Sequence, residues 1–361
     1  MNFNAFFLKS FRVLLLPFAL LYGLVVTIRN YLYNKGVLRS AQFNLPLICV
    51  GNLAVGGTGK SPMVEYLLNL LQHNYKIATL SRGYKRKTKG YALANDLSTA
   101  LDIGDEPMQF HLKFPNVAVA VGEERIVAIP QLLHDRPGIQ AIILDDAFQH
   151  RAVTAGLNIV LTDYSNLFTR DYFLPTGDLR DQRLSYKRAD IIIVTKCPPN
   201  LDTATRDNIR KEIAPLPKQQ LYFTAIEYGT PYHIIHRSER PLQLIDEVLL
   251  VCGIANPAPL QHYLGDNTAA YYQQDYSDHH IFRIDDLKDI RKRYDQIQAP
   301  QKMIVTTEKD AVRLLKFRQE LDNLPLYVLP VRHGFLFNEG GQFNRQILDF
   351  VDNFQLQPAS E

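Results

Sequence analysis

The chain has 361 residues, of which 21% are charged, with 40 lysines and arginines against 37 aspartates and glutamates and a formal net charge of +3. This composition is typical of a folded protein and excludes a disordered or fibrous chain. The nearly balanced charge gives no electrostatic reason for binding nucleic acid, so we expect no nucleic-acid partner. The three cysteines have neither disulfide-framework nor metal-site spacing.

An uncharged, mostly apolar stretch, Val13–Ile28, lies near the start of the chain. It is shorter than the roughly 20 residues that a membrane-spanning helix needs, and Pro17 and Gly23 are expected to interrupt it. Cations flank it on both sides: Lys9, Arg12, Arg29 and Lys35. We expect a monotopic helix that lies in or dips into the inner leaflet of a membrane, on the side where cytosolic ATP is available. A buried helix of the main core is the open alternative.

A glycine-rich segment, Asn52–Pro62 (NLAVGGTGKSP), follows the apolar run Leu45–Val50 and precedes a helix-like MVEYLLNLL. Strand, glycine turn and helix in this order predict a nucleotide phosphate loop, in which backbone N–H groups surround an oxyanion at the helix N-terminus. Lysine would reach the β- and γ-phosphates, and the serine hydroxyl would lie on Mg²⁺. The strict phosphate-loop pattern, G-x-x-x-x-G-K-S/T, begins with glycine, where this chain has Ala54. The predicted ATP-binding residues are Ala54, Val55, Gly56, Gly57, Thr58, Gly59, Lys60 and Ser61.

Two acidic residues end a second apolar run, Ile139–Asp146. An aspartate at the tip of such a strand binds the Mg²⁺ of a nucleotide, directly or through water. Asp145 and Asp146 are therefore the predicted metal ligands, together with Ser61. Paired acids that merely end a strand are the plain alternative.

A basic segment, Ser81–Tyr91, follows the apolar run Ile77–Leu80 and contains five cations among two tyrosines. Such a run is often only a solvated loop. Here it leaves the carboxyl end of a strand, where ligands bind in open α/β sheets, so contact with phosphate or anionic lipid is an equal expectation.

Apolar runs alternate with helical stretches, which predicts an α/β fold with a parallel sheet covered by helices on both faces. We expect a membrane-associated segment at residues 1–35, a phosphate-loop kinase domain at 36–225 and a smaller α/β domain at 226–361, whose last helix can pack back on the first domain. The remaining predicted strands are Val117–Val121, Leu157–Leu161, Ile191–Thr195, Glu247–Cys252, Lys302–Thr306 and Pro325–Val331.

A series of short motifs then occurs in order: GNLAVGGTGKSP, SRGY, GDEP, DDAFQH, LPTGDLRD, GIANP, SDHH and TEKDAV. Together they resemble the tetraacyldisaccharide 4′-kinase family over nearly the whole chain. The resemblance implies an ATP- and Mg²⁺-dependent kinase that phosphorylates an acylated disaccharide phosphate lipid in lipid A biosynthesis, with two α/β domains joined by a two-stranded hinge. It also implies peripheral or monotopic association with the cytoplasmic face of the inner membrane. Ala54 and Ala147 are mild departures from the residues more usual in that family.

The same resemblance implies residue roles. Asp105 of GDEP would be the base that receives the proton of the sugar 4′-hydroxyl, and His279 of SDHH would pair with it across the two domains. The chemistry agrees, because a sugar hydroxyl is a poor nucleophile and a carboxylate must take its proton. Without the resemblance, His279 is most simply a surface histidine, or one of two adjacent histidines at a metal site that lacks further ligands.

Two other functions stay open from sequence. A membrane-associated ATPase switch of the partitioning type would have a similar loop, but its signature lysine would stand where this chain has Val55. A kinase that acts on a soluble sugar or cofactor differs only in not needing the apolar N-terminus.

Overall fold

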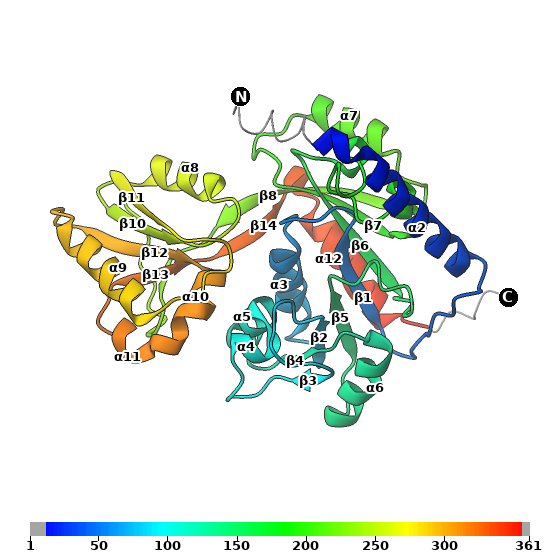
Figure 1. Ribbon diagram of the computed structural model, residues 1–361, viewed down its shortest axis with the longest axis horizontal. Coiled ribbons are helices and arrows are strands. Elements are labelled where there is room, and N and C mark those ends of the chain that lie inside the picture. The colour runs from blue at the N-terminus through cyan, green and yellow to red at the C-terminus, as the bar shows by residue number, and fades with distance from the viewer. Residues whose placement is uncertain (1–11, 356–361) are drawn as a thin grey trace.

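The computed structural model describes residues 12–355 and contains two sheets (Figure 1). The larger sheet has nine strands in the order β14-β8-β7-β6-β1-β5-β2-β4-β3, and all neighbours are parallel except at β3 and β14. Its strands are β1 (Leu47–Asn52), β2 (Ile77–Ser81), β3 (Ala92–Leu93), β4 (Ala118–Val121), β5 (Ala141–Asp145), β6 (Leu157–Asp163), β7 (Ile191–Thr195), β8 (Gln220–Tyr228) and β14 (Val331–Phe335).

Helices cover both faces of this sheet, so its central strands are buried throughout. On one face α3, α5 and α12 share a core, and on the other face α6 and α7 do. The helices in this part of the chain are η1 (Val13–Leu15), α2 (Leu16–Asn34), α3 (Lys60–Leu71), α4 (Ala100–Ile103), α5 (Asp105–Lys113), α6 (Arg125–Asp135), η2 (Phe168–Arg170), η3 (Arg183–Arg188), α7 (Thr203–Ile213), η5 (Leu336–Asn338) and α12 (Gly340–Asp352).

The smaller sheet has five strands in the order β11-β10-β12-β13-β9, and only β9 is antiparallel to its neighbour. It has its own core, with α8 on one face and α9, α10 and α11 on the other. Its elements are β9 (Tyr232–His233), β10 (Glu247–Cys252), α8 (Ala258–Asn267), β11 (Ala270–Asp275), α9 (Ile284–Gln296), β12 (Lys302–Thr307), α10 (Glu308–Leu314), η4 (Leu315–Phe317), α11 (Arg318–Leu321) and β13 (Leu326–Leu329).

The chain passes between the two sheets twice, just after β8 and just before β14, and these two strands pair antiparallel (Figure 1). The crossing segments are joined where the Gly229 N–H donates to the Pro330 carbonyl at 2.9 Å. We propose bounds of 229–330 for the second unit, since the strands on either side belong to the larger sheet. The expected range of 226–361 also included β14 and α12. The rest of the described chain is called the first unit.

Two expectations about local structure are wrong. Pro325–Val331 is not one strand: Pro330, which has no N–H to donate, separates β13 and β14, which lie in different sheets. Pro17 and Gly23 do not interrupt the N-terminal helix. Proline lies in its first turn, where no donor is needed, and the glycine allows the Phe173 ring to approach so closely that a Cβ would lie 2.7 Å from it.

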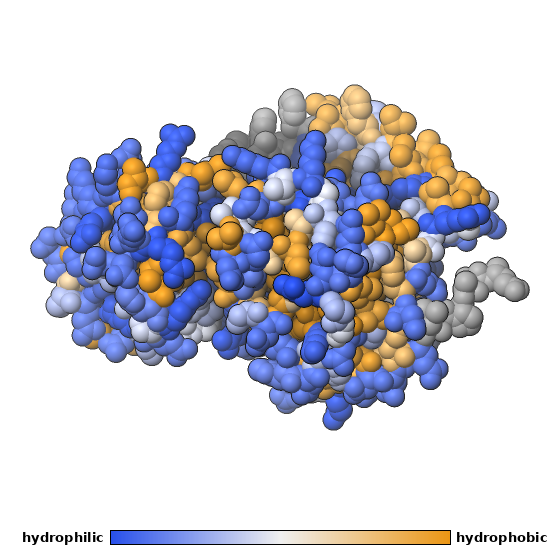
Figure 2. All heavy atoms as spheres, turned by 90° about the horizontal axis from the view of Figure 1, so that it is seen from below, coloured by the Kyte–Doolittle hydropathy of each residue, from blue (hydrophilic) through white to orange (hydrophobic). Residues whose placement is uncertain are grey.

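The helical run Val13–Asn34 is therefore 22 residues long, and by length and composition alone it could cross a membrane. Only 22% of the most apolar part of this helical run is buried against the rest of the protein, so the alternative of a buried core helix is wrong. Figure 2 shows apolar side chains gathered at the upper right, where α2 lies. Lys9, expected to flank this helix, lies outside the described residues.

Candidate active site

The predicted phosphate loop lies between β1 and α3. Gly56 and Gly59 have φ values of +106° and +86°, which glycine adopts without strain. A Cβ at Gly56 or Gly57 would meet no atom within 4 Å, so this part of the loop faces open space. The loop is shaped from inside by Asn52, whose Nδ2 donates to the Thr58 hydroxyl at 2.9 Å.

A buried histidine that the sequence reasoning missed supports the end of this loop. His333 of β14 contacts the Gly59 carbonyl through Nε2 at 2.9 Å and the Thr224 hydroxyl through Nδ1 at 3.0 Å. Burial lowers the pKa of His333 to about 4, so the ring is neutral and its Nε2–H donates to the carbonyl. Because β14 also leaves the second unit, His333 links the phosphate loop to the segment that joins the two units.

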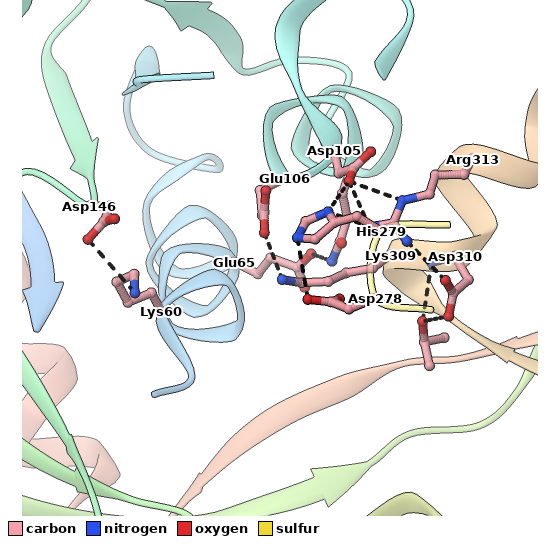
Figure 3. Close-up of polar contacts among 12 residues, drawn as sticks. Lys60, Glu65, Asp105, Glu106, Asp146, Asp278, His279, Lys309, Asp310 and Arg313 are labelled. Carbon is pink, nitrogen blue, oxygen red and sulfur yellow. Dashed lines mark hydrogen bonds and ion pairs between the residues drawn. The ribbon is translucent and has the colours of Figure 1, made fainter. Parts of the chain in front are cut away.

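The two predicted acidic residues at the tip of β5 differ sharply. Asp146 has a φ of +50° and directs its carboxylate at two cations, forming an ion pair with Arg180 and lying 3.8 Å from Lys60 Nζ (Figure 3). Although burial acts in the opposite direction, these cations lower the pKa of Asp146 to about 2. Burial also lowers the pKa of Lys60, against the effect of Asp146.

Asp145 is buried, and burial together with the Asp146 charge raises its pKa to about 7. Within residues 12–355 its Oδ1 has no hydrogen-bond partner. An unpaired buried carboxylate oxygen is costly unless something binds it, and oxygen donors are what Mg²⁺ prefers. Ser61, the second residue of α3, is partly exposed. The residues present therefore fit a magnesium ion.

At the other end of the site, the structure brings Asp105 and His279 together from the two units. Asp105 is the first residue of α5, and its Oδ2 lies 2.9 Å from His279 Nδ1. His279 lies in the turn after β11 and has a φ of +62°. Its neighbour His280 contacts Asp286 at 2.9 Å instead, and no cluster of three or more metal-binding side chains occurs in the described chain.

Arg313 of α10 completes this contact and was not predicted. Its Nε and Nη2 donate to Asp105 Oδ2 at 3.0 and 2.7 Å, and its Nη1 donates to Asp310 Oδ1 at 3.2 Å. Burial raises the pKa of Asp105, but the hydrogen bonds and charges of Arg313 and His279 outweigh it and lower the pKa. The only signal in the sequence was the position of Arg313 one residue beyond TEKDAV.

Ion pairs between α5 and α10 lie beside these residues (Figure 3). Lys309 Nζ lies 2.7 Å from Glu106 Oε1. Lys113 Nζ lies 2.5 Å from both Glu308 Oε1 of the second unit and Glu65 Oε2 of α3. These cross-unit pairs form a seam, and its members are Glu65, Glu106, Lys113, Glu308 and Lys309.

The predicted residues thus fall into two groups. Lys60 lies near Asp146 at the phosphate loop, and Asp105 contacts His279 beside the seam. Within residues 12–355 no hydrogen bond or ion pair joins one group to the other. Burial is the main cause of the lowered pKa of Lys60 and of the raised pKa of Asp145, but Lys309 adds to the first shift and Glu106 to the second, so the seam lies within electrostatic reach of the phosphate loop.

Comparison with known proteins gives consistent matches. Residues 11–352 match the family model described as Tetraacyldisaccharide-1-P 4′-kinase. The chain is 44% identical over 351 residues to the tetraacyldisaccharide 4′-kinase of Bacteroides thetaiotaomicron, covering 93% of this chain and 92% of that protein. The Flavobacterium johnsoniae enzyme of the same name is also 44% identical, with 94% and 97% covered.

A solved structure is similar over the whole fold. It is a crystal structure of LpxK from Aquifex aeolicus in complex with ATP, with a TM-score of 0.73 and 25% sequence identity. The match covers 94% of this chain and 99% of that one.

Proposed function

This chain belongs to the tetraacyldisaccharide 4′-kinase family, and from that membership we propose that it transfers the γ-phosphate of ATP to the 4′-hydroxyl of a tetraacyldisaccharide 1-phosphate in lipid A biosynthesis. The family match favours this kinase over the partitioning ATPase switch. Val55, where such a switch has its signature lysine, agrees with that preference.

One observation in the structure supports the proposal most directly. Asp105 has one carboxylate oxygen, Oδ2, in contact with Arg313 and His279, whereas within residues 12–355 its Oδ1 makes no hydrogen bond. The lowered pKa keeps this carboxylate charged at neutral pH. A charged carboxylate with one fixed oxygen and one free oxygen suits a general base that accepts a proton from an alcohol.

We propose that Lys60 and the backbone N–H groups from Ala54 to Ser61 bind the phosphates of ATP. Lys60 would offset the charge that develops on the transferred phosphoryl group. Ser61 and Asp145 would bind Mg²⁺, which supplies further charge neutralisation. Because Asp146 lies between Arg180 and Lys60, we assign it to orienting that lysine, or to a water-mediated contact with the ion.

The proposed reaction is the transfer of one phosphoryl group from ATP to the sugar hydroxyl. The 4′-oxygen forms a bond to the γ-phosphorus, the bond between that phosphorus and the β–γ bridging oxygen breaks, and ADP leaves with the electron pair. The hydroxyl proton passes to Asp105. His279 orients that carboxylate from the second unit, so the base is in place only when the two units are in contact, which also limits the access of water.

The acyl chains of the substrate imply work at a membrane, and α2 offers the surface for it. Large apolar side chains are exposed along one face of the helical run formed by η1 and α2: Val13, Leu14, Phe18, Leu20, Leu21, Leu24, Val25 and Ile28. The opposite face of α2 is hydrogen-bonded to the rest of the first unit. Tyr22 donates to the Arg180 carbonyl at 3.0 Å, and Asn30 donates to Asp181 at 2.7 Å. A helix bound along its length cannot cross a bilayer, so we propose monotopic binding to the cytoplasmic face of the inner membrane, where ATP is present.

The test is to incubate the protein with Mg-ATP and tetraacyldisaccharide 1-phosphate in anionic vesicles, and to analyse the lipid by mass spectrometry. The expected product has one added phosphate at the 4′ position. ATP hydrolysis stimulated by vesicles, with no phosphorylated lipid, would overturn the proposal in favour of a switch.

The same vesicles test the membrane surface by flotation. We expect the wild-type protein to float with the vesicles and the Leu21→Glu/Leu24→Glu variant to stay behind, because each glutamate places a charge on the proposed contact face. Leu244→Glu, at an exposed leucine of the second unit, is the matched control and should float. Equal flotation of all three would contradict the assignment of α2.

A further inference from the structure

We propose that Arg313 is a positioning residue: it holds Asp105 by one carboxylate oxygen and thereby leaves the other oxygen free to take the proton of the substrate. This inference rests on the proposed function, in which Asp105 is the base. It adds a residue to the site that binds neither nucleotide nor lipid and acts only through Asp105.

The contacts of Arg313 belong to a closed ring, of which Figure 3 labels Arg313, Asp310, Asp105 and His279. Arg313 donates to Asp310, and Asp310 Oδ2 accepts the Gly253 N–H at 3.0 Å. The Gly253 carbonyl accepts the His279 N–H at 3.3 Å. His279 and Arg313 then both contact Asp105 Oδ2, which closes the ring.

Four members of the ring belong to the second unit, and only Asp105 comes from the first. Asp310 is fully buried and also accepts the Thr307 hydroxyl at 2.7 Å, while the Arg313 side chain is 7% exposed. A guanidinium fixed on one side by a buried carboxylate loses little freedom when it binds a second one. The second unit therefore has a preformed receptor for the Asp105 carboxylate.

The geometry at Asp105 separates its two oxygens. Oδ2 lies within 3.0 Å of three nitrogens, two from Arg313 and one from His279. An oxygen with this many partners is poorly placed to accept another proton, so Oδ1 is left as the accepting atom.

Arg313 also sets the pH range in which the base works. Its hydrogen bonds and charge lower the pKa of Asp105 against the effect of burial, so removing the guanidinium raises that pKa. The acid limb of the pH–rate profile should therefore move to higher pH. The other charged or titratable groups around this carboxylate lie on four elements: His279 and Asp278 on the turn, Glu106 on α5, Lys309 and Asp310 on α10, and Tyr84 after β2, whose ring centroid lies 6.0 Å from that of His279.

The experiment measures kcat, KM and the pH dependence of kcat for Arg313→Met, Arg313→Lys and the matched control Arg318→Met. This control removes an exposed arginine at the start of α11 that makes none of these contacts in the described chain. We expect Arg313→Met to lower kcat by about 10²-fold, the scale of a misplaced catalytic group, with the acid limb shifted upward and KM nearly unchanged. Lysine restores the charge but not the fork, so it should recover part of kcat. Arg318→Met should resemble wild type.

Measuring Arg313→Met both in the wild-type protein and in the Asp105→Asn variant separates a failure of this inference from a failure of the proposed base. In the Asp105→Asn background, Arg313→Met should cause little further loss, because the arginine acts only through that carboxylate. Equal losses in both backgrounds, or a normal pH profile for Arg313→Met, would overturn the inference. Near-normal turnover of Asp105→Asn alone would instead overturn the proposed base. If Arg313→Met does not fold in a thermal unfolding assay, Arg313→Lys replaces it: a loss of kcat that disappears in the Asp105→Asn background supports the inference, and an equal loss in both backgrounds overturns it.

Discussion

At the phosphate-loop end of the site every group comes from the first unit, whereas at the Asp105 end the groups come from both units. Lys60 and Asp146 lie close together because β1 and β5 are adjacent parallel strands, with Val50 paired to Asp145 at their carboxyl ends. Asp105 meets His279 and Arg313 only because α5 of the first unit lies against α10 of the second.

This difference suggests a division of roles. The phosphate-loop end is formed whenever the first unit is folded, so it can bind nucleotide before the units come together. The contacts of Asp105 with His279 and Arg313 exist only while the units are in contact, so in the proposed mechanism the base would become available last. Such an order limits phosphoryl transfer to water while the site is open.

The largest effect is expected at the phosphate-loop end of the site. Lys60→Met should lower kcat by about 10³-fold and weaken Mg-ATP binding, since the charge on the transferred phosphoryl group loses its fixed cation. Turnover and nucleotide titration measure the two effects. Lys211→Met, an exposed position on α7, is the control and should change neither. Unchanged nucleotide affinity in Lys60→Met would contradict the claim that the phosphate-loop end binds the nucleotide.

A smaller effect is expected at the seam, where Glu65 is buried on α3 beside Lys113 and Glu308. Burial, followed by the Glu308 charge, raises the pKa of Glu65 to about 7. With a raised folded-state pKa, its contribution to stability is complete below the ordinary value for glutamate and is lost as the pH rises through about 7.

The Glu65→Gln variant has no carboxyl group at this position, so it does not lose this contribution to stability as the pH rises. We expect its free energy of unfolding to exceed that of wild type by about 2 kcal/mol at pH 8, with the difference vanishing near pH 5. Urea unfolding at the two pH values measures this, and Glu320→Gln, at an exposed glutamate of α11, should show no such change. An advantage of Glu65→Gln that is larger at pH 5 than at pH 8 would refute the sign.

The same contrast explains which parts of the site were predictable from sequence. The phosphate loop and the acids after β5 are local patterns, and each is defined by a few consecutive residues next to an apolar run. The fold class followed from the same alternation. Asp105 and His279 were found only through resemblance to a family, since 174 positions separate them and nothing local relates them.

Other elements were missed for physical reasons. β11 is an edge strand with partly exposed residues throughout, so its sequence AYYQQD lacks the apolar run that reveals a buried strand. His333 and Arg313 reach their partners across 274 and 208 positions. Their sequence neighbourhoods indicate only a strand and a helix face, so their roles depend on how the two units are arranged.

The most direct test of the account is a single-turnover measurement with Asp105→Asn, which keeps the shape of the side chain but cannot accept the proton. We predict that the variant binds Mg-ATP as wild type does and forms 4′-phosphorylated lipid at least about 10²-fold more slowly. A normal rate of product formation would contradict the claim that a base assembled between two units activates the lipid hydroxyl.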